Sequence, residues 1–105
     1  MWSVEFLPAA AEEESALSVD FRARLARMTN IIGQYCPLNV PRRWIKPLGG
    51  KLWELRVTGK DGIARALCVT LEGQRFVIVR IFVKKTQKTP HRELELARKR
   101  AKEIL

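Results

Sequence analysis

The sequence contains few of the residues from which metal sites and nucleophilic active sites are built. It has one histidine and two cysteines, Cys36 and Cys68, whose positions do not match the spacing of metal ligands. A glycine-rich phosphate loop, a Ser-His-Asp set and a pair of carboxylates placed for acid–base work are also absent. We therefore expect no metal and no cofactor, and two reduced, structural cysteines in a cytoplasmic protein.

Long hydrophobic runs, repeats and low-complexity segments are absent as well. No apolar run reaches the roughly 18 residues of a membrane span, and Met1 to Leu7 is too short and too acidic for a signal peptide. Hydrophobic residues nevertheless make up 47% of the chain, which excludes a disordered tail protein. From its 105 residues we expect one domain, spanning residues 1–105, that has no membrane partner.

Negative charge is scarce beyond the first third of the chain. Residues 1–35 carry three arginines and five carboxylates, a net charge of −2, whereas the whole chain carries +9, so the remainder carries +11. A basic segment of this size suggests a polyanionic partner, which is RNA, DNA or an acidic protein.

Three apolar segments predict β-strands, because they are rich in Val, Ile, Leu, Phe and Trp. They are Leu52 to Val57, Ile63 to Leu71, and Arg75 to Val83. The short breaks between them contain glycine, which favours tight turns and hence an antiparallel meander. Alternation of apolar and polar residues in Trp2 to Leu7 predicts a further short strand.

Two helices are predicted between the first strand and the meander. Pro8 suits the first position of a helix, and three glutamates follow it in the sequence. After a break near Ser18, with Asp20 as a candidate cap, apolar residues recur at helical spacing from Phe21, and Gly33 is expected to end this second helix. The two form a helical hairpin that covers one face of the sheet.

The proline- and glycine-rich stretch from Cys36 to Gly50 is predicted to be a loop. The chain then ends in a helix, with Thr89 as its cap and Pro90 at its first position. Its apolar stripe consists of Leu94, Ala97, Ala101 and Ile104. The fold class is therefore α+β, with a small, mostly antiparallel sheet of about four strands, an N-terminal helical hairpin and a C-terminal helix.

Arginines inside the predicted strands are the first candidate site. One register of the meander places Arg56, Arg65 and Arg80 on a common face, with a covered apolar face behind. Two interpretations are open: each arginine is a solvated residue on an exposed face, or the three line a charged concave surface. Glu54 is expected to pair with Arg56 or Arg65 and to orient it.

Other basic residues have a structural and a functional interpretation. The segment Arg42-Arg43-Trp44 could hold a phosphate and stack a base, although such a Trp more often packs on the core. The helical residues Arg22, Arg24 and Arg27 are expected to be solvated. His91 is either a partly buried structural residue or a titratable group beside Lys84 and Lys85.

Three stretches carry a resemblance to a known family. The run from Leu52 to Arg56, Arg65 in the next strand, and the run from Phe82 to Pro90 resemble the RelE/HigB superfamily of toxins, most closely its phage-derived HigB-like branch. The resemblance implies a microbial-ribonuclease-like fold and the toxin of a type II toxin–antitoxin system. It also implies metal-independent cleavage of mRNA, commonly on the ribosome, and neutralisation by a cognate antitoxin, often a HigA-like helix-turn-helix protein.

The resemblance also suggests which residues act. Arg56 and Arg65 match the sheet arginines of the family, and Lys84 and Lys85 match its basic loop. His91 lies near a position that holds Tyr or His in several relatives. These five are the predicted catalytic residues. Cations stabilise the charge that develops on a phosphorane, and a histidine can exchange a proton near neutral pH. The predicted RNA-binding residues are Lys51, Arg80, Lys88 and Arg92.

Two other functions are compatible with the same charges. One is a non-catalytic module that binds RNA or DNA on the basic face. The other is an interaction domain whose basic face binds an acidic antitoxin-like partner.

Overall fold

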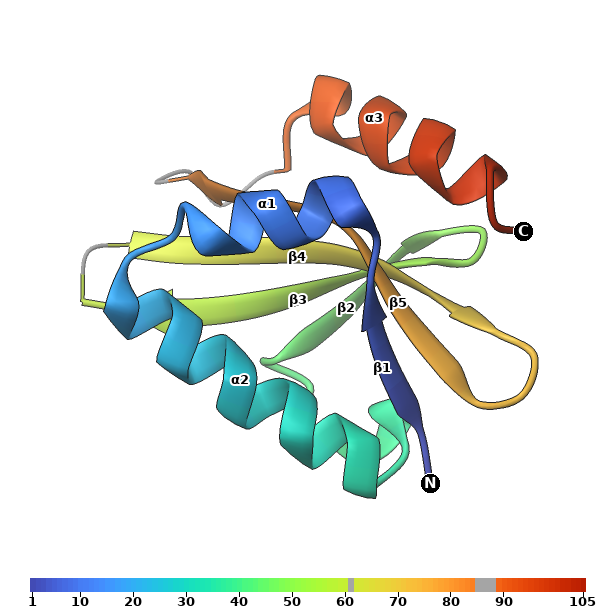
Figure 1. Cartoon of the computed structure of the whole chain (residues 1–105), viewed down its shortest axis with the longest axis horizontal. Coiled ribbons are helices and arrows are strands. Elements are labelled where there is room, and N and C mark those ends of the chain that lie inside the picture. The colour runs from blue at the N-terminus through green and yellow to red at the C-terminus, as the bar shows by residue number, and fades with distance from the viewer. Residues whose placement is uncertain (61, 85–88) are drawn as a thin grey trace.

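The computed structural model describes residues 1–60, 62–84 and 89–105, and these form three α-helices and one five-stranded sheet (Figure 1). The elements are β1 (Ser3–Phe6), α1 (Pro8–Ser15), α2 (Val19–Gln34), a 3₁₀ helix (Pro37–Asn39), β2 (Ile45–Gly49), β3 (Leu52–Gly59), β4 (Gly62–Leu71), β5 (Arg75–Lys84) and α3 (His91–Lys102). The strand order is β1-β5-β4-β3-β2. Only the β1–β5 pairing is parallel among these strands, so the predicted α+β class is confirmed.

The sheet has one strand more than the four predicted. The additional strand is β2, which lies in the segment from Cys36 to Gly50 that was predicted to be a loop. It pairs antiparallel with β3, and its register shifts between Pro47 and Gly49. A proline lacks the N–H that a central strand needs, but it is tolerated on an edge strand and near a bulge. The prolines and glycines of this segment therefore mark an edge strand.

The ends of two helices differ from the prediction. The Ser18 hydroxyl, and not Asp20, caps α2 by accepting the N–H of Phe21 at 3.2 Å. Gly33 lies inside α2 because the helix continues to Gln34. A Cβ atom on Gly33 would lie only 3.3 Å from the carbonyl oxygen of Trp2, which explains a glycine there.

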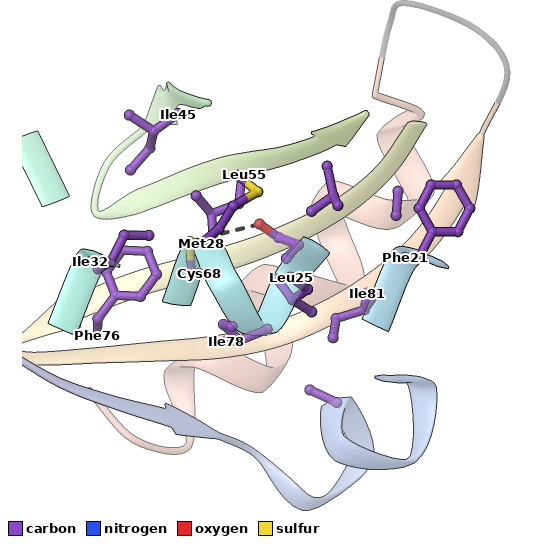
Figure 2. Packing of buried hydrophobic residues seen from close by; sticks show 14 of the residues in the cluster. Phe21, Leu25, Met28, Ile32, Ile45, Leu55, Cys68, Phe76, Ile78 and Ile81 are labelled. Atoms are coloured by element: carbon purple, nitrogen blue, oxygen red, sulfur yellow. Dashed lines mark hydrogen bonds between the residues drawn. The ribbon is translucent and has the colours of Figure 1, made fainter. Parts of the chain in front are cut away.

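The two faces of the sheet are covered by different helices. On one face, α1 and α2 pack on the larger core, and Figure 2 shows side chains of α2, such as Met28, among strand residues such as Leu55 and Cys68. The buried residues that α2 contributes are Phe21, Leu25, Met28 and Ile32. On the other face, Ala97 and Ala101 of α3 pack on a smaller core of strand residues. The predicted covering by the helical hairpin is confirmed, and so is the predicted stripe of α3.

A bulge in β5 changes which of its residues share a face. Leu67 pairs with Arg80 whereas Cys68 pairs with Ile78, so Val79 is an extra residue. Simple alternation along β5 would place Val77 and Val79 on the same face as Ile81. Because of the bulge, they instead join the core beneath α3. In the described residues, no helix is long and apolar enough to cross a membrane.

Candidate active site

Arg56 and Arg65 lie on the same face of the sheet, directly opposite one another on β3 and β4. Arg65 also pairs in register with Phe82 of β5, and two residues along the ladder Leu67 pairs with Arg80. Side chains directly opposite in a sheet point to the same side. The predicted common face for Arg56, Arg65 and Arg80 is therefore confirmed, and it is the face on which α3 packs.

Glu54 joins the two opposed arginines. One of its carboxylate oxygens, Oε2, accepts from Arg56 Nε at 2.9 Å and from Arg65 Nη1 at 3.1 Å. The other oxygen, Oε1, accepts from the hydroxyl of Thr89. The expected pairing of Glu54 with Arg56 or Arg65 is confirmed, and it involves both. We call Glu54, Arg56, Arg65 and Thr89 the shared-carboxylate cluster.

The burial of this cluster decides what its members can do. The Glu54 side chain is 0% exposed, Arg65 is 1% exposed and Arg56 is 29% exposed. The sequence suggested either that each arginine is solvated on an exposed face or that the three line a concave surface. Arg65 fits neither interpretation, because it is buried inside the protein. Arg56 is the guanidinium of the cluster that external ligands can reach. One carboxylate shared by two guanidiniums leaves a net positive charge.

The environment of Glu54 keeps it ionised. Burial acts to raise the pKa of this carboxyl, but the hydrogen bonds from Thr89 and Arg56 and the charge of Arg65 outweigh it, so the pKa lies below its ordinary value. At neutral pH Glu54 is therefore an anion that accepts hydrogen bonds and cannot donate a proton.

Thr89 is not the helix cap that the sequence suggested. Pro90 occupies the N-cap position of α3, without a side-chain capping bond, and the helix begins at His91. The Thr89 hydroxyl instead binds Glu54. This contact fixes the start of α3 beside the two arginines, and sequence reasoning missed it because a threonine before Pro-His reads equally well as a cap.

His91 follows two residues after this contact. Its side chain is 80% exposed, and its Nε2 lies 2.9 Å from Glu95 Oε1 one helical turn away. The partly buried structural interpretation of His91 is therefore wrong. Arg92 is also exposed at the start of α3.

Lys84 ends β5 on the same side of the sheet as the arginines. Its register partner is Ile63. This pair lies two residues along the ladder from the pair Arg65 and Phe82, so its side chains point to the same face. Lys84 is half-buried. Lys85 and Lys88 lie outside the described residues.

Two of the predicted RNA-binding residues lie apart from the cluster. Lys51 is exposed in the turn before β3, five residues from Arg56, a separation of roughly 17 Å along a strand. Arg80 is held by carboxylates from two helices: its Nε lies 2.9 Å from Glu93 Oε1 of α3, and its Nη1 pairs with Glu13 of α1.

Glu13 also protects the edge of β5 beyond the end of β1. Its Oε1 accepts the backbone N–H of Ile81 at 3.0 Å and Nη1 of Arg100 at 3.0 Å, while Arg100 donates to the carbonyl of Val79 at 2.8 Å. Unpaired strand edges need such partners. Arg80 thus belongs to a network that joins α1, β5 and α3. In the described part of the chain no group of three His, Cys, Asp or Glu residues is arranged to hold a metal.

The comparisons with known proteins agree with this architecture. The family model described as "Phage derived protein Gp49-like (DUF891)" matches residues 12–102. No curated protein matches the chain significantly. Three solved structures of RelE proteins are similar to it, at 12% to 14% sequence identity.

A chain of the archaeal RelE–RelB complex from Pyrococcus horikoshii OT3 aligns with a TM-score of 0.66 at 13% identity, covering 83% of this chain and 98% of the other. An arginine-to-alanine double mutant of the E. coli toxin RelE in the free state gives a TM-score of 0.66 at 12% identity, covering 99% and 98%. The isolated E. coli RelE toxin gives 0.61 at 14% identity, with full coverage of both chains. The chain therefore belongs to the Gp49-like family of phage-derived proteins, and its fold is that of the RelE toxins.

Proposed function

We propose that this protein is the toxin of a type II toxin–antitoxin system, a metal-independent endoribonuclease that inhibits translation by cutting mRNA, on the ribosome, in the cytoplasm. The observation that carries the proposal is the shared-carboxylate cluster. It holds two guanidiniums side by side on one face of the sheet, with Lys84 on that face at the end of β5.

The proposed reaction is attack by a ribose 2′-OH on the adjacent phosphorus, with departure of the 5′-oxygen of the next nucleotide. Negative charge builds on the non-bridging oxygens in the transition state, and preorganised cations lower its free energy. Arg56 is exposed enough to contact those oxygens, and its guanidinium can bind two of them at once. Arg65, being buried, positions Arg56 through Glu54 and adds positive charge.

Proton transfer is assigned to His91 and the lysines. His91 is exposed at the end of α3 that Thr89 fixes beside Glu54, and an imidazole can act both as a proton acceptor and as a proton donor. Lys84 and Lys85 are proposed to position the phosphate or to protonate the leaving oxygen. Lys51, Arg80, Lys88 and Arg92 remain predicted RNA contacts, and Arg80 has the weakest support because it already binds two carboxylates.

A cognate antitoxin is the proposed protein partner. The archaeal structure that resembles this chain is a RelE–RelB complex. By analogy we propose that an antitoxin, predicted to be a HigA-like helix-turn-helix protein, binds and neutralises this chain.

The proposal is tested by inducing the protein in bacteria and mapping mRNA 5′ ends. Wild-type protein should arrest growth and produce new 5′ ends within translated messages. Arg56→Ala should lower cleavage by about 10²- to 10³-fold, the usual cost of removing one transition-state donor. Arg22→Ala, which removes an exposed arginine of α2, is the matched control and should cleave normally. Undiminished cleavage by a folded Arg56→Ala protein would contradict the assignment.

A second candidate is a non-catalytic RNA-binding module, and the pairing of His91 with Glu95 favours it, because that contact occupies the proposed proton-transfer group. Such a protein would bind RNA with strong salt dependence. It would produce no new 5′ ends at any concentration, whereas the enzyme would.

A further inference from the structure

A basic cleft lies on the edge of the sheet between α2 and β3, apart from the residues assigned to catalysis except for Arg56. Its volume is about 350 Å³. Four arginines from three segments line it: Arg24 and Arg27 of α2, Arg43 of the segment before β2, and Arg56 of β3. Trp44 and Val57 also contribute to its wall. None of the described residues that line the cleft is acidic.

The cleft exists because β2 is shorter than β3. The pairing of the two strands stops at Ile45 and Leu55, which leaves the far end of β3 as an edge in the described part of the sheet. The last backbone contact joins the Arg56 N–H to the Trp44 carbonyl at 2.8 Å, and the Trp44 N–H binds the Pro41 carbonyl at 2.9 Å. These bonds fix Trp44 at the cleft, half-buried and packed against the larger core.

The guanidiniums of the cleft are only partly neutralised. Arg24 pairs with Asp20 at 2.9 Å, and Arg56 pairs with Glu54. Among the residues that the structure describes, Arg27 and Arg43 form no ion pair, and both are exposed. Surface arginines with the same sign of charge repel one another unless an anion lies between them. The cleft therefore favours an anionic ligand.

We propose that this cleft binds the phosphates and one base of a single-stranded RNA segment. Arginine forks match phosphate oxygens, and an aromatic ring fixed at the cleft wall offers a stacking surface for a base. An acidic protein segment would use the arginines but not the indole face, so the combination favours RNA.

Arg56 connects the cleft to the proposed catalytic cluster. Its Nε binds Glu54 on the α3 face, and Arg56 is also one of the residues that line the cleft at the edge of β3. This part of the inference rests on the proposed function. The bond that is cut lies on the α3 face, and the nucleotides beside it pass over the edge of β3 into the cleft. The cleft would then add affinity for longer RNA without taking part in the chemistry.

The test compares two double variants of equal charge. Arg27→Ala/Arg43→Ala removes two cleft arginines, and Arg22→Ala/Lys46→Ala removes two exposed neighbouring cations that do not line the cleft. Binding of a fluorescent 2′-O-methyl RNA dodecamer, which cannot be cleaved, is measured by anisotropy at several salt concentrations. The cleft variant should bind roughly tenfold more weakly at 0.1 M salt, with a salt slope shallower by about 1.4, because two phosphate contacts are lost. The neighbour variant should lose clearly less affinity.

A third variant tests the stacking role of Trp44. Trp44→Leu should weaken binding of the dodecamer by about tenfold with little change in salt slope, whereas Trp44→Phe should retain most of the affinity. Circular dichroism confirms that each variant is folded.

The outcomes separate this inference from the proposed function. Equal loss of affinity in the two double variants would overturn the cleft assignment, whatever the cleavage assays show. Loss of binding to poly-glutamate but not to RNA in the cleft variant would overturn it in favour of an acidic protein ligand. Failure of wild-type protein to cut any mRNA would refute the nuclease, while the loss of dodecamer binding in the cleft variant would still support the cleft.

Discussion

Arg56 and Arg65 face one another across β3 and β4 and donate hydrogen bonds to the same carboxylate oxygen. Like charges directly opposite in a sheet destabilise it. Here the buried Glu54 carboxylate lies between the two guanidiniums and offsets their repulsion by accepting a hydrogen bond from each. The resulting bridge tolerates two cations close together, and it leaves the more exposed of them, Arg56, with a fixed orientation.

Glu54→Gln should destabilise the protein strongly at neutral pH. The substitution leaves Arg65 buried without its anion, and breaking a buried pair in this way costs roughly 3–5 kcal/mol. Urea denaturation at pH 7 measures this free energy. Glu72→Gln, in the exposed turn between β4 and β5, is the control and should change stability little. A Glu54→Gln protein as stable as wild type would show that the bridge does not hold the fold.

The same carboxylate should make stability depend on acidity. The pKa of Glu54 is lowered on folding, so its ionised form stabilises the folded state fully above the ordinary pKa of about 4.3. This stabilisation is lost as the pH falls through the lowered value. The difference in unfolding free energy between wild type and Glu54→Gln should therefore be constant from pH 7 to about pH 5 and shrink below that. Urea denaturation at several pH values measures this difference. If it does not change with pH, ionised Glu54 is not the source of the stabilisation.

Thr89→Val should loosen the start of α3. Loss of a hydrogen bond to a charged acceptor costs on the order of 1.5–3 kcal/mol. Cleavage should fall more than stability alone explains, because the start of α3, which carries the proposed proton-transfer residue His91, would no longer be fixed to Glu54. Thr29→Val is a matched control, since the Thr29 hydroxyl donates to the Ala26 carbonyl on an exposed part of α2, away from Glu54. Equal effects of the two variants on cleavage would remove the positioning role of Thr89.

Arg80→Gln should lower the stability of the protein more than it lowers the affinity for RNA. Arg80 joins Glu13 and Glu93, and these carboxylates raise the pKa of Arg80, chiefly because Arg80 donates hydrogen bonds to Glu93. Losing these bonds should cost on the order of 1.5–3 kcal/mol, measured by urea denaturation. If Arg80→Gln keeps its stability but binds RNA more weakly, Arg80 is an RNA contact as the sequence suggested.

His91→Gln should separate chemistry from binding. Removing a general acid or base typically lowers the rate by 10²- to 10⁴-fold. RNA affinity, measured with the uncleavable dodecamer, should stay near that of wild type. A variant that cleaves at the normal rate would transfer the proton-transfer role to the lysines.

The elements of this fold follow closely from the sequence where periodicity is strong. The strands around Leu55, Ala66 and Ile78 are rich in apolar residues, and both longer helices have clear apolar stripes. β2 was not predictable in the same way, because its proline and glycine residues signal loops unless the neighbouring strand is known. The α3 cap was misassigned because a local rule competed with a partner, Glu54, that lies 35 residues away.

The candidate site shows the same division. Alternation along the strands was enough to place Arg56 and Arg65 on one face. Their burial was not predictable, because it depends on α3 and on a carboxylate positioned by tertiary contacts. The cleft around Trp44 was suggested only as Arg42-Arg43-Trp44, and the helical arginines that complete it were expected to be merely solvated.

The extra residue at Val79 makes the length of β5 as important as its composition. It brings Val77 and Phe82 to the same side of the sheet although they are five positions apart. Deleting one residue there would turn the stretch from Arg80 to Lys84 over, so that its cationic groups would point toward the helical hairpin and its aliphatic groups toward the face on which α3 packs. A deletion of one codon would thus exchange the two faces of half of β5. No single substitution in the strand could do this.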